Sequence, residues 1–326
     1  MSGQGTPGGV VARVPLGRRG VTVSRIGFGT APIGGLFSSV GDDAAEATLA
    51  AAWAGGVRYF DTAPHYGLGS AERRLGAFLA GLDPAARAEA VVSTKVGRLL
   101  EPGRTAPGTE SFHDGAPLVR RRDYTSEGVY RSLADSLERS GLDAFDIALI
   151  HDPDEHWAEA AGVAYPALAR LRDEGAVRAI GVGMNQTAML ARFVTETDID
   201  CVMVAGRYSL LDRSAADELL PLCAERGVGV LAAGVFNSGV LADPRPGAHY
   251  DYAPAPEAVL RRARWMADRC AAHEVPLAAA ALRFPLRHPA VTGIVVGART
   301  PAEITTDLTL AATQIPDALW DELTPA

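Results

Sequence analysis

Four side chains that can exchange protons or hold charge follow short apolar runs in the first half of the chain. Asp61 ends the run VRYFD, Lys95 ends AVVSTK and His151 ends DIALIH, while Tyr66 follows Asp61 in the segment DTAPHYG. If these runs are neighbouring parallel strands of a barrel, their carboxyl ends meet at one mouth. We therefore expect Asp61, Tyr66, Lys95 and His151 to form one catalytic site.

The chemistry of the four groups is complementary. A free tyrosine has a pKa near ~10, which is too high for ready proton exchange at neutral pH. A nearby ammonium favours the phenolate, so we expect Lys95 to lower the pKa of Tyr66, with Asp61 holding Lys95 charged. His151 is expected to donate a hydrogen bond to a substrate oxygen. This set suits proton transfer at oxygen while hydride moves at carbon, which requires a cofactor because no side chain supplies hydride.

Each residue also has a structural interpretation when it is taken alone. Asp61 could cap a helix or a turn, Tyr66 could be a packing aromatic, and His151 could be a structural histidine. Lys95 is harder to explain in this way, because a lysine that ends a buried strand has a desolvation cost without a partner. The four residues together, at successive strand ends, favour the catalytic interpretation.

Eight short apolar runs alternate with amphipathic stretches along the chain. They are continuous rather than alternating in polarity, which is typical of parallel strands buried on both faces. The predicted strands are Arg25–Gly29, Val57–Asp61, Ala90–Lys95, Asp146–His151, Arg178–Gly183, Asp200–Ala205, Val228–Ala232 and Gly293–Gly297.

Helix-like segments separate the predicted strands. Ser70, Ser126 and Thr300 are expected to cap three of them. Eight strands separated by helices favour an α/β fold, a closed (β/α)8 TIM barrel, over a doubly wound open sheet, and no GxGxxG motif follows any strand. The predicted helices are Asp43–Ala54, Ser70–Ala80, Ser126–Ser140, Glu155–Glu174, Gln186–Glu196, Arg213–Arg226 and Pro301–Ala312.

Some segments fall outside this repeat. Val11–Ser24 is expected to form a β-hairpin at the bottom of the barrel. Gly97–Tyr124 and Phe236–Pro256 are predicted to be long irregular loops at the carboxyl-terminal mouth. Ala255–Ala272 predicts an extra helix, followed by another that begins near Pro276. Residues 1–10 are Gly-rich and expected to be disordered, and residues 11–326 are expected to form a single domain.

Composition limits the classes of function. The 326 residues are 48% apolar and carry a formal charge of −8, with no basic block that would bind nucleic acid. Cys201, Cys223 and Cys270 are odd in number and widely spaced, as expected of buried thiols in the cytoplasm. No apolar run is long enough for a membrane span.

The run HDPDEH (151–156) fits no helical metal-ligand spacing, so no metal site is expected. The run Arg120–Arg122 is expected to face solvent, although a substrate role stays open. A monomer or weak homo-oligomer is expected.

Three motifs resemble the aldo-keto reductases. They are YFDTAPHYGLGSAERRLG (59–76), STKVG (93–97) and DIALIHDPD (146–154), and the similarity covers nearly the whole chain. The resemblance implies that Tyr66 is the general acid/base, that Lys95 and Asp61 tune it, and that His151 positions the substrate carbonyl. The loop ending in RRDYTSEGVYRSLADSLERSGLD (121–143) is similar to the branch of L-fucose or D-threo-aldose 1-dehydrogenases and pyridoxal 4-dehydrogenase.

The resemblance also implies cofactor contacts. NADP or NAD is expected, and Glu303, where NADP-preferring members often have arginine, leaves the preference open. Gly29 and Thr30 are expected under the nicotinamide, Asn185 at its carboxamide, Gly234 to Phe236 beside the pyrophosphate, and Gly297, Ala298 and Arg299 at the adenosine phosphate. Ala233 stands where many relatives have an aromatic that stacks on nicotinamide, for which Phe236 could substitute.

The resulting functional prediction is an NAD(P)-dependent oxidoreductase. It transfers hydride between nicotinamide and a sugar anomeric carbon or a carbonyl substrate, in the manner of an aldose 1-dehydrogenase. The alternatives are a pyridoxal 4-dehydrogenase and a general aldehyde or ketone reductase. A minor alternative is a regulatory subunit that binds the cofactor without turnover.

Overall fold

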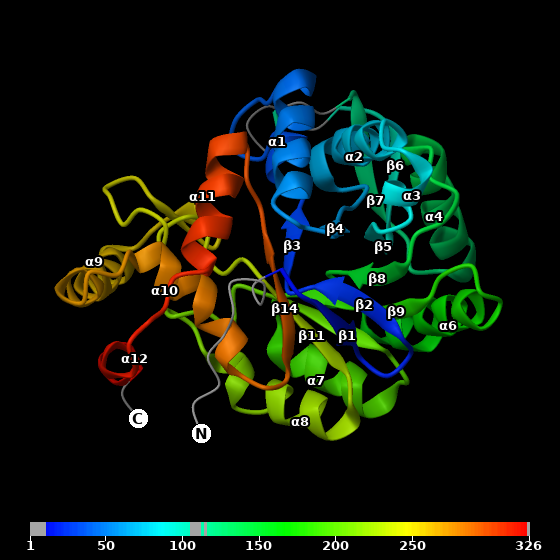
Figure 1. The fold of residues 1–326 in the computed structure, drawn as a ribbon. Helices are drawn as coiled ribbons and strands as arrows, with labels where there is room; N and C mark the ends of the chain where they lie inside the picture. The colour runs from blue at the N-terminus through cyan, green and yellow to red at the C-terminus, as the bar shows by residue number, and fades with distance from the viewer. Residues whose placement is uncertain (1–10, 105–111, 114–115, 325–326) are drawn as a thin grey trace.

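Eight parallel strands close into a barrel in the computed structural model (Figure 1). The structure describes residues 11–104, 112–113 and 116–324, so the expected disorder of residues 1–10 lies outside the described residues. Each strand pairs with the next in chain order, and β14 closes the barrel on β3, which confirms the predicted barrel and excludes the open sheet. The strands are β3 (Ile26–Gly29), β4 (Tyr59–Asp61), β5 (Val91–Val96), β8 (Ile147–His151), β9 (Ala179–Met184), β10 (Cys201–Ala205), β11 (Gly229–Ala233) and β14 (Val291–Val296).

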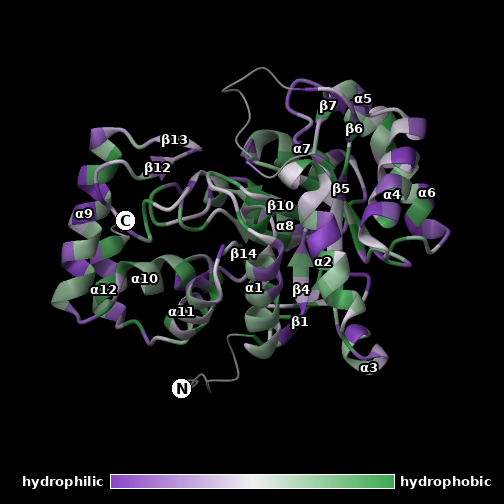
Figure 2. Cartoon of the chain, turned by 90° about the horizontal axis from the view of Figure 1, so that it is seen from above, coloured by the Kyte–Doolittle hydropathy of each residue, from purple (hydrophilic) through white to green (hydrophobic). Residues whose placement is uncertain are grey.

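Helices surround the barrel and bury their apolar faces against the strands. The segment predicted as one helix over 155–174 instead contains α5, a π-helical stretch at 160–164 and α6. The extra helix α9 and the unpredicted α12 lie to one side of the barrel in Figures 1 and 2. The helices are α1 (Asp42–Ala54), α2 (Ser70–Ala80), α3 (Pro84–Arg87), α4 (Ser126–Ser140), α5 (Trp157–Glu159), α6 (Tyr165–Asp173), α7 (Thr187–Glu196), α8 (Leu219–Arg226), α9 (Glu257–Ala272), α10 (Leu277–Arg283), α11 (Pro301–Ala311) and α12 (Asp317–Leu323).

The predicted helix caps are only partly correct. Thr300 accepts a hydrogen bond from the backbone N–H of Glu303 and caps α11 as expected. Helix α4 is capped one residue earlier than predicted, because Thr125 rather than Ser126 accepts from the N–H of Gly128. Ser70 is the first residue of α2 rather than its cap.

The N-terminal hairpin closes the bottom of the barrel, as predicted. Its strands are β1 (Arg13–Leu16) and β2 (Val21–Ser24), and the buried Leu16 packs with residues that fill the barrel interior. The turn lies so close to the start of β10 that a side chain at Gly17 would collide with the carbonyl oxygen of Asp200. The hairpin thus covers the end of the barrel opposite the predicted site.

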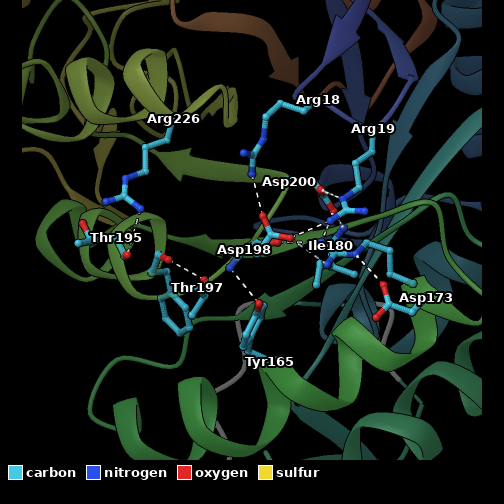
Figure 3. A network of polar contacts seen from close by, with 12 residues as sticks. Arg18, Arg19, Tyr165, Asp173, Ile180, Thr195, Thr197, Asp198, Asp200 and Arg226 are labelled. Carbon is cyan, nitrogen blue, oxygen red and sulfur yellow. Dashed lines mark hydrogen bonds and ion pairs between the residues drawn. The ribbon is translucent and has the colours of Figure 1, made fainter.

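Charged contacts fasten this hairpin to the barrel (Figure 3). Arg18 and Arg19 both pair with Asp198, at 2.8 and 2.7 Å. Arg19 also donates to Asp200, which is 1% exposed and accepts further hydrogen bonds from Arg172 and from the N–H of Ile180. Because the Asp200 carboxylate is buried but fully engaged, it holds the hairpin without an uncompensated charge.

The two long loops lie at the opposite end, but the prediction that they are irregular is wrong in part. Strands β6 (Arg98–Pro102) and β7 (Leu118–Arg122) form an antiparallel ladder within the first loop. The second contains the short pair β12 (His249–Tyr250) and β13 (Ala253–Pro254). The prediction failed because it rested on the Pro- and Gly-rich composition of each loop as a whole. That overall composition does not reveal short strands within the loop.

The three cysteines are buried, as expected of small apolar side chains. Burial raises the pKa of Cys223 to about 12 and that of Cys270 to about 11, so neither is a thiolate near neutrality. Among the described helices, none has the length and apolar character that a bilayer-spanning segment needs.

Candidate active site

Neighbouring strands bring the four predicted catalytic residues together. Asp61, Lys95 and His151 lie at the carboxyl ends of β4, β5 and β8, which are adjacent in the barrel, and Tyr66 begins the 3₁₀ segment that follows β4. Nζ of Lys95 lies 2.6 Å from Oδ2 of Asp61 and 4.6 Å from the centroid of the Tyr66 ring. The ring centroids of Tyr66 and His151 are 6.0 Å apart. The expected convergence is therefore present.

A hydrogen-bond chain inside the barrel fixes Asp61. Its Oδ1 accepts from the hydroxyl of Ser93 at 2.7 Å, and that hydroxyl lies 2.9 Å from the Tyr59 hydroxyl. Lys95 donates a second hydrogen bond to the carbonyl oxygen of Thr62. Sequence reasoning missed Ser93 and Tyr59, yet each lies two residues before a predicted site residue on the same strand face. The two-residue repeat of side-chain direction along a strand was thus the sequence signal that could have identified Ser93 and Tyr59.

The environment of Tyr66 shifts its pKa in the direction opposite to the one expected. Burial in the mouth raises the pKa of Tyr66 well above its usual value, and the negative charge of Asp61 raises it further. The expected net lowering of the Tyr66 pKa is therefore wrong, because burial and the Asp61 charge outweigh the attraction of the Lys95 ammonium for the phenolate. Tyr66 is thus a neutral phenol near pH 7 and can donate a proton.

His151 is neutral and firmly held. Burial lowers its pKa well below the usual value, and the positive charges of Arg98 and Lys95 lower it further. Tyr124 donates to the carbonyl oxygens of His151 and Asp152, each at 2.9 Å. Tyr124 in turn packs on Gly97, where φ is +96° and a side chain would collide with the tyrosine ring. A neutral imidazole in a fixed place can hydrogen-bond a substrate oxygen.

An arginine that sequence reasoning did not single out links two sides of this mouth. Arg98 donates from Nη2 to Oδ2 of Asp152 at 2.6 Å, and its Nη1 lies 3.4 Å from Nδ1 of His65. Burial and then the charge of Arg98 lower the pKa of His65 to about 2. Asp152 lies inside a motif quoted above, directly after His151, and Arg98 directly follows the motif STKVG, so adjacency was the only sequence signal.

The three arginines of the run 120–122 on β7 differ in whether they face the site or the solvent. Arg120 donates to the carbonyl oxygen of His65 at 3.0 Å, so it faces the site. Arg121 is exposed and pairs with Glu101 and Asp123 at 2.8 and 2.9 Å. Within this run only Arg120 lies where a substrate role is feasible, because Arg121 and Arg122 are both exposed to solvent.

Most of the predicted cofactor residues lie along one side of the mouth. Gly29 and Thr30, Gly234 and Phe236, and Gly297 to Arg299 lie at the ends of β3, β11 and β14, which are neighbours in the barrel. We call these seven residues the cofactor rim. Asn185 lies apart from them, directly after β9.

The cofactor rim has features that suit a close-lying ligand. Thr30 is fully buried and donates to the carbonyl oxygen of Asp61 at 3.0 Å, which connects the rim to the tetrad. Gly234 has a φ of +64° and lies exposed beyond β11. A side chain at Gly297 would approach Pro32 to 2.6 Å, so glycine keeps the chain ends close here. Phe236 is half-buried and Ala298 is buried.

Arg299 stands at the start of α11. Its backbone N–H donates to Glu303 at 2.7 Å, and its guanidinium lies 3.3 Å from the Ser38 hydroxyl and 3.5 Å from Glu303. Helix α11 has 11 residues, and a helix N-terminus attracts anions. Here the side chain of Glu303 already places a negative charge at that terminus.

Comparison with known proteins matches residues 25–325 to the aldo/keto reductase family. The chain belongs to this family. A D-threo-aldose 1-dehydrogenase from Pseudomonas sp is 46% identical over 315 residues, which cover 94% of this chain and 95% of the relative. A pyridoxal 4-dehydrogenase from Microbacterium luteolum is 41% identical over 329 residues, with the same coverage. The solved holo form of an aldo-keto reductase from Bacillus halodurans, 22% identical, has a TM-score of 0.75 over 96% of this chain and 95% of its own, and supports the fold.

Family membership confirms the resemblance seen in the sequence motifs. An aldo-keto reductase is an oxidoreductase that uses a nicotinamide cofactor on a small-molecule substrate. The rim residues fit such a group, because exposed glycines, the N-terminus of α11 and Thr30 lie at or directly after adjacent strand ends, and Thr30 contacts Asp61 of the tetrad.

Proposed function

We propose that this aldo-keto reductase is an aldose 1-dehydrogenase, with residues 11–326 acting as one domain. The observation that supports it most directly is the buried Lys95–Asp61 pair beneath the Tyr66 ring, beside a neutral His151. The 46% identity to a D-threo-aldose 1-dehydrogenase supports the substrate class. The 41% identity to a pyridoxal 4-dehydrogenase keeps pyridoxal as the second candidate.

Each residue of the tetrad has a defined role in this proposal. His151 donates from Nε2 to the oxygen on the reacting carbon and orients it. Tyr66 exchanges the proton of that oxygen, taking it during oxidation and returning it during reduction. Lys95, held by Asp61, lies beside the ring of Tyr66 and stabilises the phenolate whenever it forms. The bound nicotinamide supplies the hydride acceptor or donor that no side chain provides.

Aldoses and pyridoxal share the feature that this site needs. Each presents a cyclic hemiacetal whose hydroxyl-bearing carbon can lose hydride while the hydroxyl loses its proton. Oxidation of an aldose therefore gives a lactone and leaves the proton with Tyr66. General aldehydes lack this ring, so they would react only in the reductive direction through the same four residues.

We propose that the cofactor is NAD rather than NADP. The Glu303 carboxylate accepts the N–H of Arg299 and lies at the N-terminus of α11, where the extra phosphate of NADP would need to bind. Two negative charges that compete for one helix N-terminus repel each other. Arg299 offsets this repulsion only in part, because its guanidinium already lies 3.5 Å from Glu303.

The deciding experiment is an absorbance assay for reduced nicotinamide. Both cofactors are tested against L-fucose, D-arabinose, L-galactose, pyridoxal and simple aldehydes. We expect NAD-dependent oxidation of the sugars, which Tyr66→Phe abolishes while cofactor affinity changes by no more than a few-fold. Near-native turnover of Tyr66→Phe would refute the mechanism. Cofactor binding without turnover on the whole panel would favour a regulatory role instead.

A further inference from the structure

The loop that follows β8 places a carboxylate directly beside the histidine of the tetrad. Oδ2 of Asp152 lies 3.4 Å from Nε2 of His151, and it accepts the 2.6 Å hydrogen bond from Arg98. The Asp152 side chain is 33% exposed, whereas that of Arg98 is 14% exposed. Asp152 is thus the member of the pair that a substrate in the mouth can reach.

The backbone at Asp152 is held in an unfavourable conformation. Its φ is +41°, which residues with a side chain rarely adopt. Tyr124 donates to its carbonyl oxygen at 2.9 Å, and its own N–H donates to the carbonyl oxygen of Gly183 at 3.0 Å. Strained positions that the surroundings hold in place are concentrated at functional sites. These contacts fix the position of Asp152 beside His151.

We propose that Asp152 binds the hydroxyl group on the carbon next to the reacting carbon, and that Arg98 positions the carboxylate. This inference rests on the proposed function, because His151 must hold the reacting oxygen. Neighbouring oxygens of a sugar are about as far apart as two hydrogen-bonded atoms. An oxygen held by Nε2 of His151 therefore brings the adjacent hydroxyl within reach of Asp152. The substrate class is a 2-hydroxy aldose.

The hydrogen-bond acceptor that Asp152 provides separates this class from pyridoxal. A carboxylate accepts a hydrogen bond from a neutral sugar hydroxyl, and charge-assisted hydrogen bonds of this kind are the stronger ones. In pyridoxal the carbon next to the reacting carbon is an aromatic ring carbon that carries no hydroxyl group. Asp152 therefore has no hydrogen-bond donor at the corresponding place. The geometry thus favours the aldose over the second candidate.

The test uses two sugars that differ only at this hydroxyl, D-arabinose and 2-deoxy-D-ribose. We expect wild-type kcat/KM to favour D-arabinose by at least about 100-fold, because a site built around a hydroxyl discriminates strongly against an analogue without it. Asp152→Ala should lower kcat/KM for D-arabinose by about 100-fold and that for 2-deoxy-D-ribose by less than about threefold. The quantity compared is the ratio of kcat/KM for D-arabinose to kcat/KM for 2-deoxy-D-ribose. Comparing this ratio between the wild type and a variant cancels the difference in intrinsic reactivity of the two sugars.

Further variants separate positioning from folding. Asp152→Asn keeps the shape of the side chain and should still reduce the ratio by at least about tenfold. Arg98→Ala should reduce the ratio, and Arg98→Lys should restore part of it. Arg178→Ala is the matched control, because Arg178 is an exposed arginine paired with Asp146 at 2.8 Å where β9 begins, at the far end of the barrel. Fluorescence titration with the cofactor verifies that each variant is folded.

The outcomes distinguish this inference from the proposed function. If Asp152→Ala slows both sugars by the same factor, Asp152 acts only through His151 and the inference is overturned. If Asp152→Ala slows neither sugar, the inference is overturned as well. In both cases the aldose dehydrogenase proposal survives. If the wild-type protein binds the cofactor but oxidises no sugar, the proposed function itself fails and this inference fails with it.

Discussion

Nζ of Lys95 lies 2.6 Å from Oδ2 of Asp61, and the two side chains are 2% and 3% exposed. Removing one partner of such a pair leaves a buried charge without compensation, which typically costs about 3–5 kcal/mol. We expect Asp61→Asn to lower the free energy of unfolding by about this amount and to reduce kcat strongly. Urea unfolding and steady-state kinetics measure the two effects.

The double variant provides the control for this prediction. Asp61→Asn combined with Lys95→Met removes both charges, so it should be less destabilised than the sum of the single variants. It should remain inactive, because nothing then stabilises a Tyr66 phenolate. Additive losses of stability would show that the two side chains do not interact as the 2.6 Å distance indicates.

The protonation states of Tyr66 and His151 predict a flat pH profile for carbonyl reduction. The pKa of Tyr66 is raised well above its usual value by burial and Asp61, and that of His151 is lowered well below its usual value by burial and Arg98. Neither group changes its protonation between about pH 6 and about pH 9. We expect kcat/KM for reduction to vary by less than about threefold over this range.

Oxidation of a sugar should behave differently, because Tyr66 must then accept a proton. A raised tyrosine pKa means that the phenolate fraction grows with pH, so the oxidation rate should climb continuously toward alkaline pH. Stopped-flow measurement of the hydride step in both directions separates the two profiles. A reduction rate that falls between about pH 6 and about pH 8 would contradict the neutral-phenol assignment.

Much of the fold could be predicted from the sequence, because the strands lie within short apolar runs that amphipathic helical segments separate. The tetrad was predictable for the same reason, since Asp61, Lys95 and His151 end three of these runs. The Arg98–Asp152 pair was not, because it joins two loops whose relative placement appears in no local pattern. The direction of the Tyr66 pKa shift was also not predictable, because it depends on burial and on how closely Asp61 compensates Lys95.

The buried histidines predict acid instability. The pKa of His65 is lowered to about 2 by burial and Arg98, and that of His151 is also lowered. Each remains neutral when folded but gains a proton when unfolded below about pH 6.5, so stability is lost as pH falls. Each histidine should contribute a slope of about 1.4 kcal/mol per pH unit below that value.

A single substitution isolates the contribution of His65. His65→Asn should roughly halve the combined histidine slope of unfolding free energy against pH, which urea unfolding at several pH values measures. His249→Asn, in the loop after β11, is the matched control and should leave the slope unchanged. If His65→Asn does not alter the slope, the low pKa of His65 is wrong.

Glu303 predicts the cofactor preference. Glu303→Gln removes the negative charge at the N-terminus of α11 while keeping an acceptor for the N–H of Arg299. We expect kcat/KM for NADP to rise by about 5- to 10-fold and that for NAD to change by less than about threefold. Glu138→Gln, an exposed position on α4, serves as the control. An unchanged NADP to NAD ratio would remove the electrostatic basis of the proposed preference.

Asp307 on α11 predicts a stabilising substitution. Burial, and then the charge of Glu303, raise the pKa of the Asp307 carboxyl to about 7. The unfolded chain ionises this group near about pH 4, so the folded state loses stability as pH rises from about 4 to about 7. Asp307→Asn removes this penalty. Its melting temperature should exceed that of the wild type by roughly 2–6 °C at pH ~8, a modest gain because the side chain is partly solvated.

The pH dependence of this gain separates electrostatics from packing. Near pH ~4 the Asp307 carboxyl is protonated in the folded protein and nearly isosteric with the amide, so the two melting temperatures should coincide there. Asp268→Asn on α9, an exposed aspartate, should change the melting temperature at neither pH. Differential scanning calorimetry at both pH values makes the comparison. A gain of equal size at acidic and alkaline pH would mean that the amide improves packing and that Asp307 ionises without penalty.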